Sequence, residues 1–166
     1  QVVIKVQRKG IYETMARDIS LLHKAVKLLP PVSLKGIVDL DMVLDELWKV
    51  TREEMNFITE AGNMEEFARK NADVSFVGVP ELYQEYSTIH VLVMEYVDGF
   101  AVDDKETLLE NGYDLKEVGS KLVDNYIKQV MDDGFFHADP HPGNVKIREG
   151  KIIWMDMGMM GRLSER

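Results

Sequence analysis

One stretch near the end of the chain, residues 134–158, constrains the possible fold more than any other part of the sequence. It reads GFFHADPHPGNVKIREGKIIWMDMG and sets His137, Asp139 and Asn144 in the pattern H-x-D-x-x-x-x-N. Two short apolar segments follow, joined around a Glu-Gly pair, and the second leads into Asp156. Apolar segments on either side of a glycine turn predict two short strands. Such strands would place Asn144 and Asp156 side by side.

Oxygen-bearing side chains in this spacing are the groups that phosphoryl transfer requires. Transfer from a nucleoside triphosphate needs a cation on the phosphates, a carboxylate that orients this cation, a base near the acceptor, and ligands for Mg²⁺. Mg²⁺ prefers oxygen ligands. Asp139 can be the base, and Asn144 and Asp156 can hold the metal. The stretch therefore predicts a kinase-like site, with a catalytic loop and a metal-binding loop joined by the strands.

The N-terminal part of the chain can supply the cation and its partner. Residues 1–7 read QVVIKVQ, and the β-branched residues around Lys5 predict a strand that carries it. A long helix predicted over residues 39–71 carries Glu54 and Glu60. These two are six residues apart on one helix, so they point about 120° from each other and only one can easily reach Lys5. Glu60 is favoured because small residues follow it and permit close approach.

The remaining elements complete an α+β chain. The order is strand, two helices, two strands, helices, polar loop and small hairpin. The part up to residue 97 is expected to form a mixed small lobe, and residues 98–166 the start of a mostly helical large lobe. The other expected elements are helices over 11–29 and 115–133, a short helix within 101–114, and strands over 77–86 and 89–97, with a hairpin turn at Ser87 and Thr88 between these strands.

Composition limits the classes of function. With 166 residues, 45% hydrophobic and 30% charged, the chain has the size and composition of one soluble globular domain. Its net charge of −9 and dispersed Lys and Arg argue against nucleic acid as a partner. The absence of Cys excludes disulfides and thiolate metal sites. No apolar run approaches a membrane span and no signal peptide is visible, so a cytoplasmic protein is expected.

Five blocks, in this order along the chain, resemble the UbiB/AarF family of atypical kinase-like proteins associated with ubiquinone biosynthesis. They are VVIKVQRKGI, EEMNFITEAGN, VLVMEYVDG, GFFHADPHPGN and the final Asp-Met-Gly, and together they span nearly the whole chain. HADPHPGN is the most specific of them. The resemblance implies a protein-kinase-like two-lobe fold that binds ATP with Mg²⁺ or Mn²⁺. It also implies an atypical kinase or ATPase that acts in isoprenoid-quinone biosynthesis or lipid homeostasis.

The resemblance assigns roles to individual residues. It implies Met94 as the gatekeeper, and Glu95 to Val97 as the hinge whose backbone meets adenine. The nucleotide-binding lysine, the catalytic-loop aspartate and the two metal ligands are implied to be Lys5, Asp139, Asn144 and Asp156.

The sequence departs from the family pattern in four places. A Lys-x-Gly-Gln motif and an Ala/Gly-rich phosphate loop are absent, so a truncated domain is expected. The family's Glu-x-Asp reads Glu-Met-Asn from Glu54, and the Phe of Asp-Phe-Gly is Met157. The implied partners are a nucleotide and lipid or quinone-pathway proteins. Contact with the inner face of a membrane is expected only through segments outside this chain.

Other functions remain open from the sequence. Aminoglycoside and choline kinases carry a similar H-x-D-x-H-P-x-N loop, so a small-molecule phosphotransferase is an alternative. A non-catalytic nucleotide-binding scaffold is another. A metal hydrolase could use His137, Asp139 and His141, although Lys5 would then be unexplained. For His137 we favour packing beneath the loop, while His141 either shapes the loop or contacts a substrate.

Overall fold

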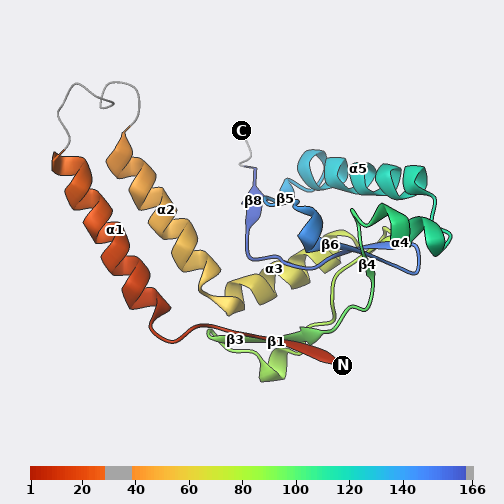
Figure 1. Cartoon of the computed structure of the whole chain (residues 1–166), viewed down its shortest axis with the longest axis horizontal. Coiled ribbons are helices and arrows are strands. Elements are labelled where there is room, and N and C mark those ends of the chain that lie inside the picture. The colour runs from red at the N-terminus through yellow and green to blue at the C-terminus, as the bar shows by residue number, and fades with distance from the viewer. Residues whose placement is uncertain (29–38, 164–166) are drawn as a thin grey trace.

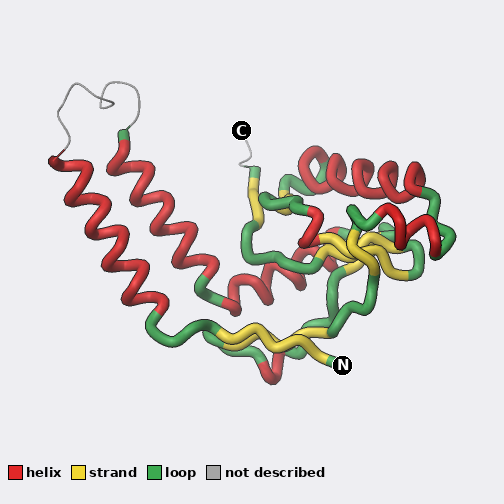
Figure 2. Tube along the Cα trace, in the orientation of Figure 1, coloured by secondary structure: helices red, strands yellow, loops and turns green. Residues whose placement is uncertain are grey.

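The computed structural model describes residues 1–28 and 39–163. Its helices lie in two groups (Figure 1). One group is an antiparallel helix pair that projects from the rest of the molecule, and the other surrounds the C-terminal strands (Figure 2). The helices are α1 (Ile11–Leu28), α2 (Leu40–Glu54), α3 (Phe57–Lys70), α4 (Lys105–Glu110) and α5 (Leu115–Met131), with 3₁₀ turns at Gln84–Tyr86 and Pro142–Asn144.

The strands of the described residues form three small sheets. β1 and β3 make an antiparallel ribbon, β5 pairs with β8, and a mixed sheet has the order β2-β7-β6-β4. Together with the helices they give the α+β class that the sequence predicts. The strands are β1 (Val2–Val6), β2 (Val77–Gly78), β3 (Val91–Glu95), β4 (Phe100–Ala101), β5 (Phe135–His137), β6 (Val145–Arg148), β7 (Lys151–Trp154) and β8 (Met160–Arg162).

Several predicted elements are confirmed. The helix expected over 11–29 is α1; its last residue and the Pro-Pro pair after it lie outside the described residues. The helix expected over 115–133 is α5, and the short one within 101–114 is α4. The two short strands around the Glu-Gly pair are β6 and β7, which pair antiparallel with Glu149 and Gly150 at positive φ in the turn. Asn144 directly precedes β6 and Asp156 lies two residues after the end of β7, so the hairpin brings both residues to the same end of the pair.

The single long helix predicted over 39–71 is wrong, because the chain forms two helices there. Asn56 has extended backbone angles (φ −113°, ψ 96°), and its side chain accepts a hydrogen bond from the Ile58 main-chain N–H. A side chain that satisfies a free N–H at a helix start ends the preceding helix and begins the next one. Glu54 and Glu60 therefore belong to different helices, and the 120° argument does not apply to them.

The strand predicted over 77–86 is also wrong beyond its first two residues. β2 pairs in parallel with β7, about 75 residues later in the chain, and β3 pairs with β1 rather than with the segment before it. Isolated bridges from Leu82 to Met94 and from Thr88 to Val91, and a hydrogen bond from the Val93 N–H to Ser87 Oγ, link the stretch before β3 to this strand. The expected hairpin of two long strands is replaced by a 3₁₀ turn, because β3 has its long partner elsewhere in the chain.

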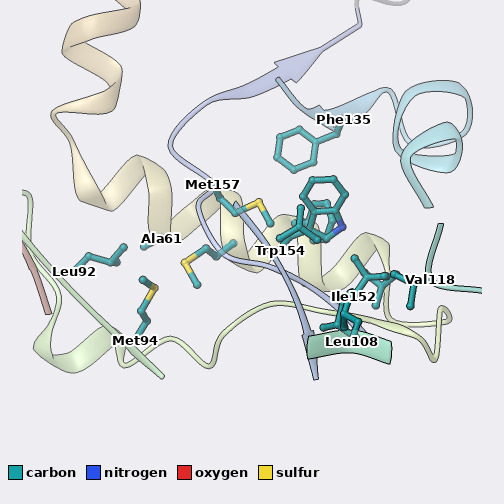
Figure 3. Close-up of a cluster of buried hydrophobic side chains, with 14 residues drawn as sticks. Ala61, Leu92, Met94, Leu108, Val118, Phe135, Ile152, Trp154 and Met157 are labelled. Atoms are coloured by element: carbon teal, nitrogen blue, oxygen red, sulfur yellow. The ribbon is translucent and has the colours of Figure 1, made fainter. Parts of the chain in front are cut away.

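The core lies between α3, α5 and the β6–β7 hairpin (Figure 3). Trp154 is fully buried, and its ring lies 6.2 Å from that of Phe67 on α3 and 6.3 Å from that of Tyr126 on α5. Val145 and Ile147, which alternate with more exposed residues along β6, are buried on the same side. The hairpin that carries the polar loops is thereby fixed to helices from both halves of the chain.

Candidate active site

The residues predicted to bind phosphate or metal, or to support those that do, line one cavity of about 290 Å³. β1 and α3 supply one wall, the end of α2 supplies a rim, and the connections around the β6–β7 hairpin supply the opposite wall. The lining residues are Lys5, Glu54, Phe57, Glu60, His137, Asp139, Asn144, Asp156, Gly158 and Met159.

Lys5 bridges two carboxylates in this cavity. It lies opposite Leu92 in the β1–β3 ribbon, and cross-strand partners share one face, so its side chain is on the face that the core covers. Lys5 Nζ lies 2.6 Å from Glu60 Oε1 and 2.8 Å from Asp156 Oδ2. Of the two glutamates considered from the sequence, Glu60 forms the ion pair. The contact with Asp156 was not foreseen.

Glu60 is more deeply buried than Lys5, and this difference affects the pKa of each group. Burial acts to lower the pKa of Lys5, but the charges and hydrogen bonds of Glu60 and Asp156 outweigh it and raise that pKa. Glu60 is only 4% exposed, and its burial raises its pKa even though Lys5 partly opposes this. Lys5 therefore stays charged, and Glu60 depends on Lys5 for its own charge.

Asp156 has both carboxylate oxygens engaged. Oδ2 accepts from Lys5, and Oδ1 accepts from the main-chain N–H of Gly158 at 2.9 Å. Burial acts to raise the pKa of Asp156, but the hydrogen bonds from Lys5 and Gly158 more than offset it, so the pKa is lowered. Asp156 is therefore an ionised carboxylate at neutral pH.

Asp139 and Asn144 are joined within the loop between β5 and β6. The amide nitrogen of Asn144 donates to the main-chain oxygen of Asp139 at 3.1 Å and lies 3.4 Å from its carboxylate. The main-chain oxygen of Asn144 accepts from Met155 N–H at 2.9 Å, which ties the loop to the end of β7. His141 Nδ1 accepts from Gly143 N–H at 3.0 Å, so His141 shapes the turn.

His137 connects the two loops from beneath. Its Nδ1 accepts the Asp139 main-chain N–H at 3.2 Å, so its Nε2 carries the proton and donates to the main-chain oxygen of Asp156. The ring stacks on Trp154 with centroids 5.0 Å apart, and burial lowers the pKa of His137. Neutral His137 thus fixes Asp139 relative to Asp156, in line with the packing role favoured from the sequence.

Glu54 lies at the rim, close to the other carboxylates. Partial burial raises its pKa, and the negative charges of Asp156 and Asp139 raise it further. Its carboxylate is therefore within electrostatic reach of both aspartates. A bound cation in the cavity would relieve this repulsion.

The residues implied to hold adenine do not line this cavity. Met94 lies opposite Val3 in the ribbon and so shares the face that carries Lys5, but it is 3% exposed and packed in the core. The Glu95 side chain is paired with Arg148, and the Val97 main-chain oxygen accepts from Lys146 Nζ at 2.8 Å. The structure thus groups the predicted phosphate and metal residues and leaves Met94, Glu95 and Val97 apart from them.

The donor set in the cavity fits Mg²⁺ bound together with a phosphate. Asn144 uses its amide nitrogen on Asp139, so its amide oxygen is the atom suited to a metal, and Asp156 is an ionised carboxylate. Mg²⁺ is commonly held by one or two such ligands, with water and substrate phosphates completing the shell.

The hydrolase alternative finds no support in the geometry. Within residues 1–28 and 39–163, no three His, Cys, Asp or Glu side chains are arranged to hold a metal ion. His137 has both ring nitrogens committed to main-chain partners, and His141 bonds within its own turn. A metal centre built on His137, Asp139 and His141 would need His137 to give up at least one of its two main-chain bonds.

Three lining residues, Phe57, Gly158 and Met159, were not singled out from the sequence. Phe57 opens α3 directly after the Asn56 cap, so its position follows from the helix break that the apolar pattern concealed. Gly158 belongs to the Asp-Met-Gly, where its N–H holds Asp156. The signal for Gly158 was therefore present in the motif. Met159 carried no signal beyond its place in a Met-rich run.

Comparison with known proteins gives a consistent result. A family model described as the ABC1 atypical kinase-like domain matches residues 1–166. A solved structure, the complex of Rv3197 with erythromycin from Mycobacterium tuberculosis, superimposes with a TM-score of 0.77 at 25% identity. The match covers 97% of this chain and 40% of that one. The fold is therefore protein-kinase-like, as the motif order predicted.

Some of the curated relatives carry kinase names. The chain is 38% identical over 170 residues to the chloroplastic protein ACTIVITY OF BC1 COMPLEX KINASE 8 of Arabidopsis thaliana. It is 33% identical over 171 residues to a probable protein kinase UbiB of Histophilus somni. An uncharacterized protein from the hydrogenase 1 5′ region of Clostridium pasteurianum is 42% identical over 164 residues. Each match covers 99% of this chain, which spans 22%, 31% and 31% of these relatives respectively.

Proposed function

We propose that this chain, which belongs to the ABC1 atypical kinase-like family, binds ATP with Mg²⁺ or Mn²⁺ and directs the transfer or hydrolysis of its terminal phosphoryl group. One observation carries the proposal: Lys5 bridges Glu60 and Asp156 in a cavity whose opposite wall holds Asp139 and Asn144. These are the side-chain types that phosphoryl transfer requires, gathered from four separate parts of the chain.

Each residue then has a role that follows from its contacts. Lys5 contacts the nucleotide phosphates and Glu60 holds the lysine in place, while Asp156 and Asn144 hold the metal ion. The metal ion neutralises charge on the phosphates when it is bound. Asp139 orients the hydroxyl group of an acceptor, or a water molecule, and accepts its proton. His137 keeps the two aspartates at a fixed separation.

The wider function rests on the relatives. One relative is named a probable protein kinase UbiB, which supports a role of the whole protein in isoprenoid-quinone biosynthesis or lipid homeostasis. The proposed partners beyond the nucleotide are therefore lipids or quinone-pathway proteins, at the cytoplasmic side of a membrane. No helix in residues 1–28 or 39–163 has the length and hydropathy of a membrane span.

We also propose the lobe boundary at residue 97, with β2 contributing to the sheet of the larger lobe.

The test is ATP turnover by the Asp139→Asn variant, made in the protein with its natural flanking sequence. Asn keeps the size of Asp139 but cannot accept a proton, so kcat should fall by about 100-fold or more. The dissociation constant for Mg-ATP should change by less than about threefold, because Lys5 and Asp156 are untouched. Asp124→Asn, the same chemical change on the exposed side of α5, is the matched control.

The outcomes separate the candidate functions. If Asp139→Asn and Asp124→Asn turn over ATP equally fast, Asp139 has no part in the mechanism. If the parent protein binds Mg-ATP but neither hydrolyses it nor transfers phosphate, the chain is a nucleotide-binding scaffold. Labelled phosphate recovered on a small molecule, rather than as free phosphate, would indicate a small-molecule phosphotransferase.

A further inference from the structure

Three buried amide side chains form a continuous chain of hydrogen bonds behind the cavity. They are Asn71, Asn125 and Gln129, which are 5%, 1% and 0% exposed, and we call them the amide relay. Asn125 Nδ2 donates to Asn71 Oδ1 at 2.7 Å, and Gln129 Nε2 donates to Asn125 Oδ1 at 2.8 Å. The relay therefore links the residue after α3 to two successive turns of α5.

The direction of every bond in the relay is fixed by groups that can only donate or only accept. The Trp154 indole N–H can only donate, and it donates to Asn125 Oδ1 at 2.9 Å. The His137 main-chain N–H can only donate, and it donates to Gln129 Oε1 at 3.0 Å. At the other end Asn71 Nδ2 donates to the main-chain oxygen of Phe67 at 3.0 Å. Each amide thus has one orientation that satisfies all its neighbours.

The two ends of the relay lie at two different parts of the proposed site, α3 and the catalytic loop. Phe67 is in the last turn of α3, the helix whose first turn carries Glu60. His137 begins the catalytic loop, and its ring holds the main chain at Asp139 and at Asp156. A rigid connection between these ends sets where Glu60 stands relative to Asp139.

We propose that Asn71, Asn125 and Gln129 are positioning residues that couple α3 to the catalytic loop. The proposal deepens the phosphoryl-transfer function given above and rests on it for its catalytic consequence. Burying three amides is costly unless every hydrogen bond is made, and a satisfied buried network specifies one arrangement of its surroundings. Among the described residues no buried side-chain nitrogen or oxygen lacks a partner, so every side-chain nitrogen and oxygen of the relay makes at least one hydrogen bond.

The mechanical part of the proposal is tested without any catalysis, by amide hydrogen exchange in the nucleotide-free protein. Asn71→Ala cuts the relay two hydrogen bonds away from His137. We expect exchange at the His137 and Asp139 N–H groups to become at least tenfold faster. Val118→Ala is the matched control, because Val118 is a buried residue of α5, two turns before Asn125, and is not part of the relay. Equal exchange in both variants would overturn the proposal.

A second variant keeps the test decisive if Asn71→Ala does not fold. Gln129→Met keeps the length of the side chain and removes both of its hydrogen bonds, so exchange at Asp139 should again be faster than in Val118→Ala. If Asp139 is as protected in Gln129→Met as in that control, the relay does not position the loop.

The catalytic part is tested by separating kcat from nucleotide affinity. In Gln129→Met we expect kcat to fall about tenfold or more, with the dissociation constant for Mg-ATP changed by less than about threefold. Each protein is assayed at the same number of degrees below its own melting temperature. Under these conditions Val118→Ala should have a kcat and a dissociation constant for Mg-ATP near those of the parent. Equal kcat in the two variants overturns the catalytic role. If the relay variants show faster exchange in the catalytic loop but the parent protein shows no ATP turnover, the relay is supported and the proposed function is refuted.

Discussion

Lys5 is held by two carboxylates of different character. Glu60 is almost fully buried and has a raised pKa because of that burial, whereas Asp156 is more exposed and has a lowered pKa because Lys5 and Gly158 donate to it. Glu60 is therefore the structural partner that Lys5 keeps ionised. Under the proposed function, Asp156 is the partner that would exchange Lys5 for a metal ion when a nucleotide brings its phosphates to the lysine.

Removing the charge of Lys5 should leave a buried carboxylate without a partner. We expect Lys5→Met to lower the free energy of unfolding of the nucleotide-free protein by about 1–3 kcal/mol. The double variant Lys5→Met with Glu60→Gln should regain most of this loss, because the amide needs no counter-charge. Denaturant unfolding of the parent and both variants at neutral pH measures these changes in the free energy of unfolding. A double variant as unstable as Lys5→Met alone would show that Glu60 does not depend on the lysine.

His137 should make stability depend on pH. Burial lowers its pKa, so the unfolded chain binds a proton more readily than the folded one. The contribution of His137 is therefore complete above about pH 6.5 and is lost as the pH falls below this unfolded-state value. Unfolding experiments between pH 5 and about pH 8 measure the slope.

The comparison with His137→Gln isolates that contribution. Burial raises the pKa of Glu60, so Glu60 makes the folded protein more stable as the pH falls, opposite to His137. The pH dependence of the parent protein therefore combines both contributions. The difference between parent and variant should grow smaller as the pH falls. A difference that stays constant from pH 8 to about pH 5 would mean that His137 is not held neutral by burial.

At the level of whole elements, the break between α2 and α3 decides which glutamate reaches Lys5. The cap at Asn56 begins α3, and α3 carries Glu60 into the core while Glu54 stays at the cavity rim. The family pattern has an Asp where this chain has Asn56. Both side chains can accept the Ile58 N–H, so either residue type can begin α3 at this position.

Substitutions at Asn56 test the cap. Asn56→Ala should lower the free energy of unfolding by about 1 kcal/mol, because it removes the acceptor for the Ile58 N–H. Asn56→Asp should be neutral or stabilising, since a carboxylate caps equally well and favours a helix N-terminus. Thermal or denaturant unfolding of the pair checks this. If both variants lose the same stability, the side chain at this position does not cap α3.

The elements that the sequence predicted correctly are those with local signals. The apolar periodicity of α1 and α5 and the glycine turn between β6 and β7 lie within the elements themselves. The misread elements depend on distant partners or on one polar residue. β2 has its partner β7 far away in the chain, and one Asn divides a continuous apolar stripe into two helices.

The same distinction holds for the site. The types and positions of Lys5, Asp139, Asn144 and Asp156 stood out in motifs, and the cavity collects all four. The contact of Lys5 with Asp156 joins residues 151 positions apart, which no local pattern reveals. The amide relay was also invisible, because Asn71, Asn125 and Gln129 look like ordinary polar helix residues until the fold buries them.

At the scale of the whole molecule, the cavity is lined from β1, α3 and the connections around the C-terminal hairpin. Figure 1 shows how these elements are arranged. The projecting α1–α2 pair has contacts of its own: the rings of Tyr12 and Trp48 are 5.3 Å apart, and His23 lies between Asp41 and Asp45. The site and the core behind it are thus built by the rest of the chain, with Glu54 at the base of the pair as the shared residue.

The central claim is that this cavity binds Mg-ATP through Lys5 and Asp156, and calorimetric titration tests it most directly. The parent, Asp156→Asn and the control Asp124→Asn are each titrated with ATP in the presence and absence of Mg²⁺, with the natural flanking sequence retained. We predict Mg²⁺-dependent binding by the parent and the control, and a loss of about tenfold or more in Asp156→Asn, equal to about 1.4 kcal/mol or more. Mg-ATP binding to Asp156→Asn with unchanged affinity and unchanged Mg²⁺ dependence would contradict the claim.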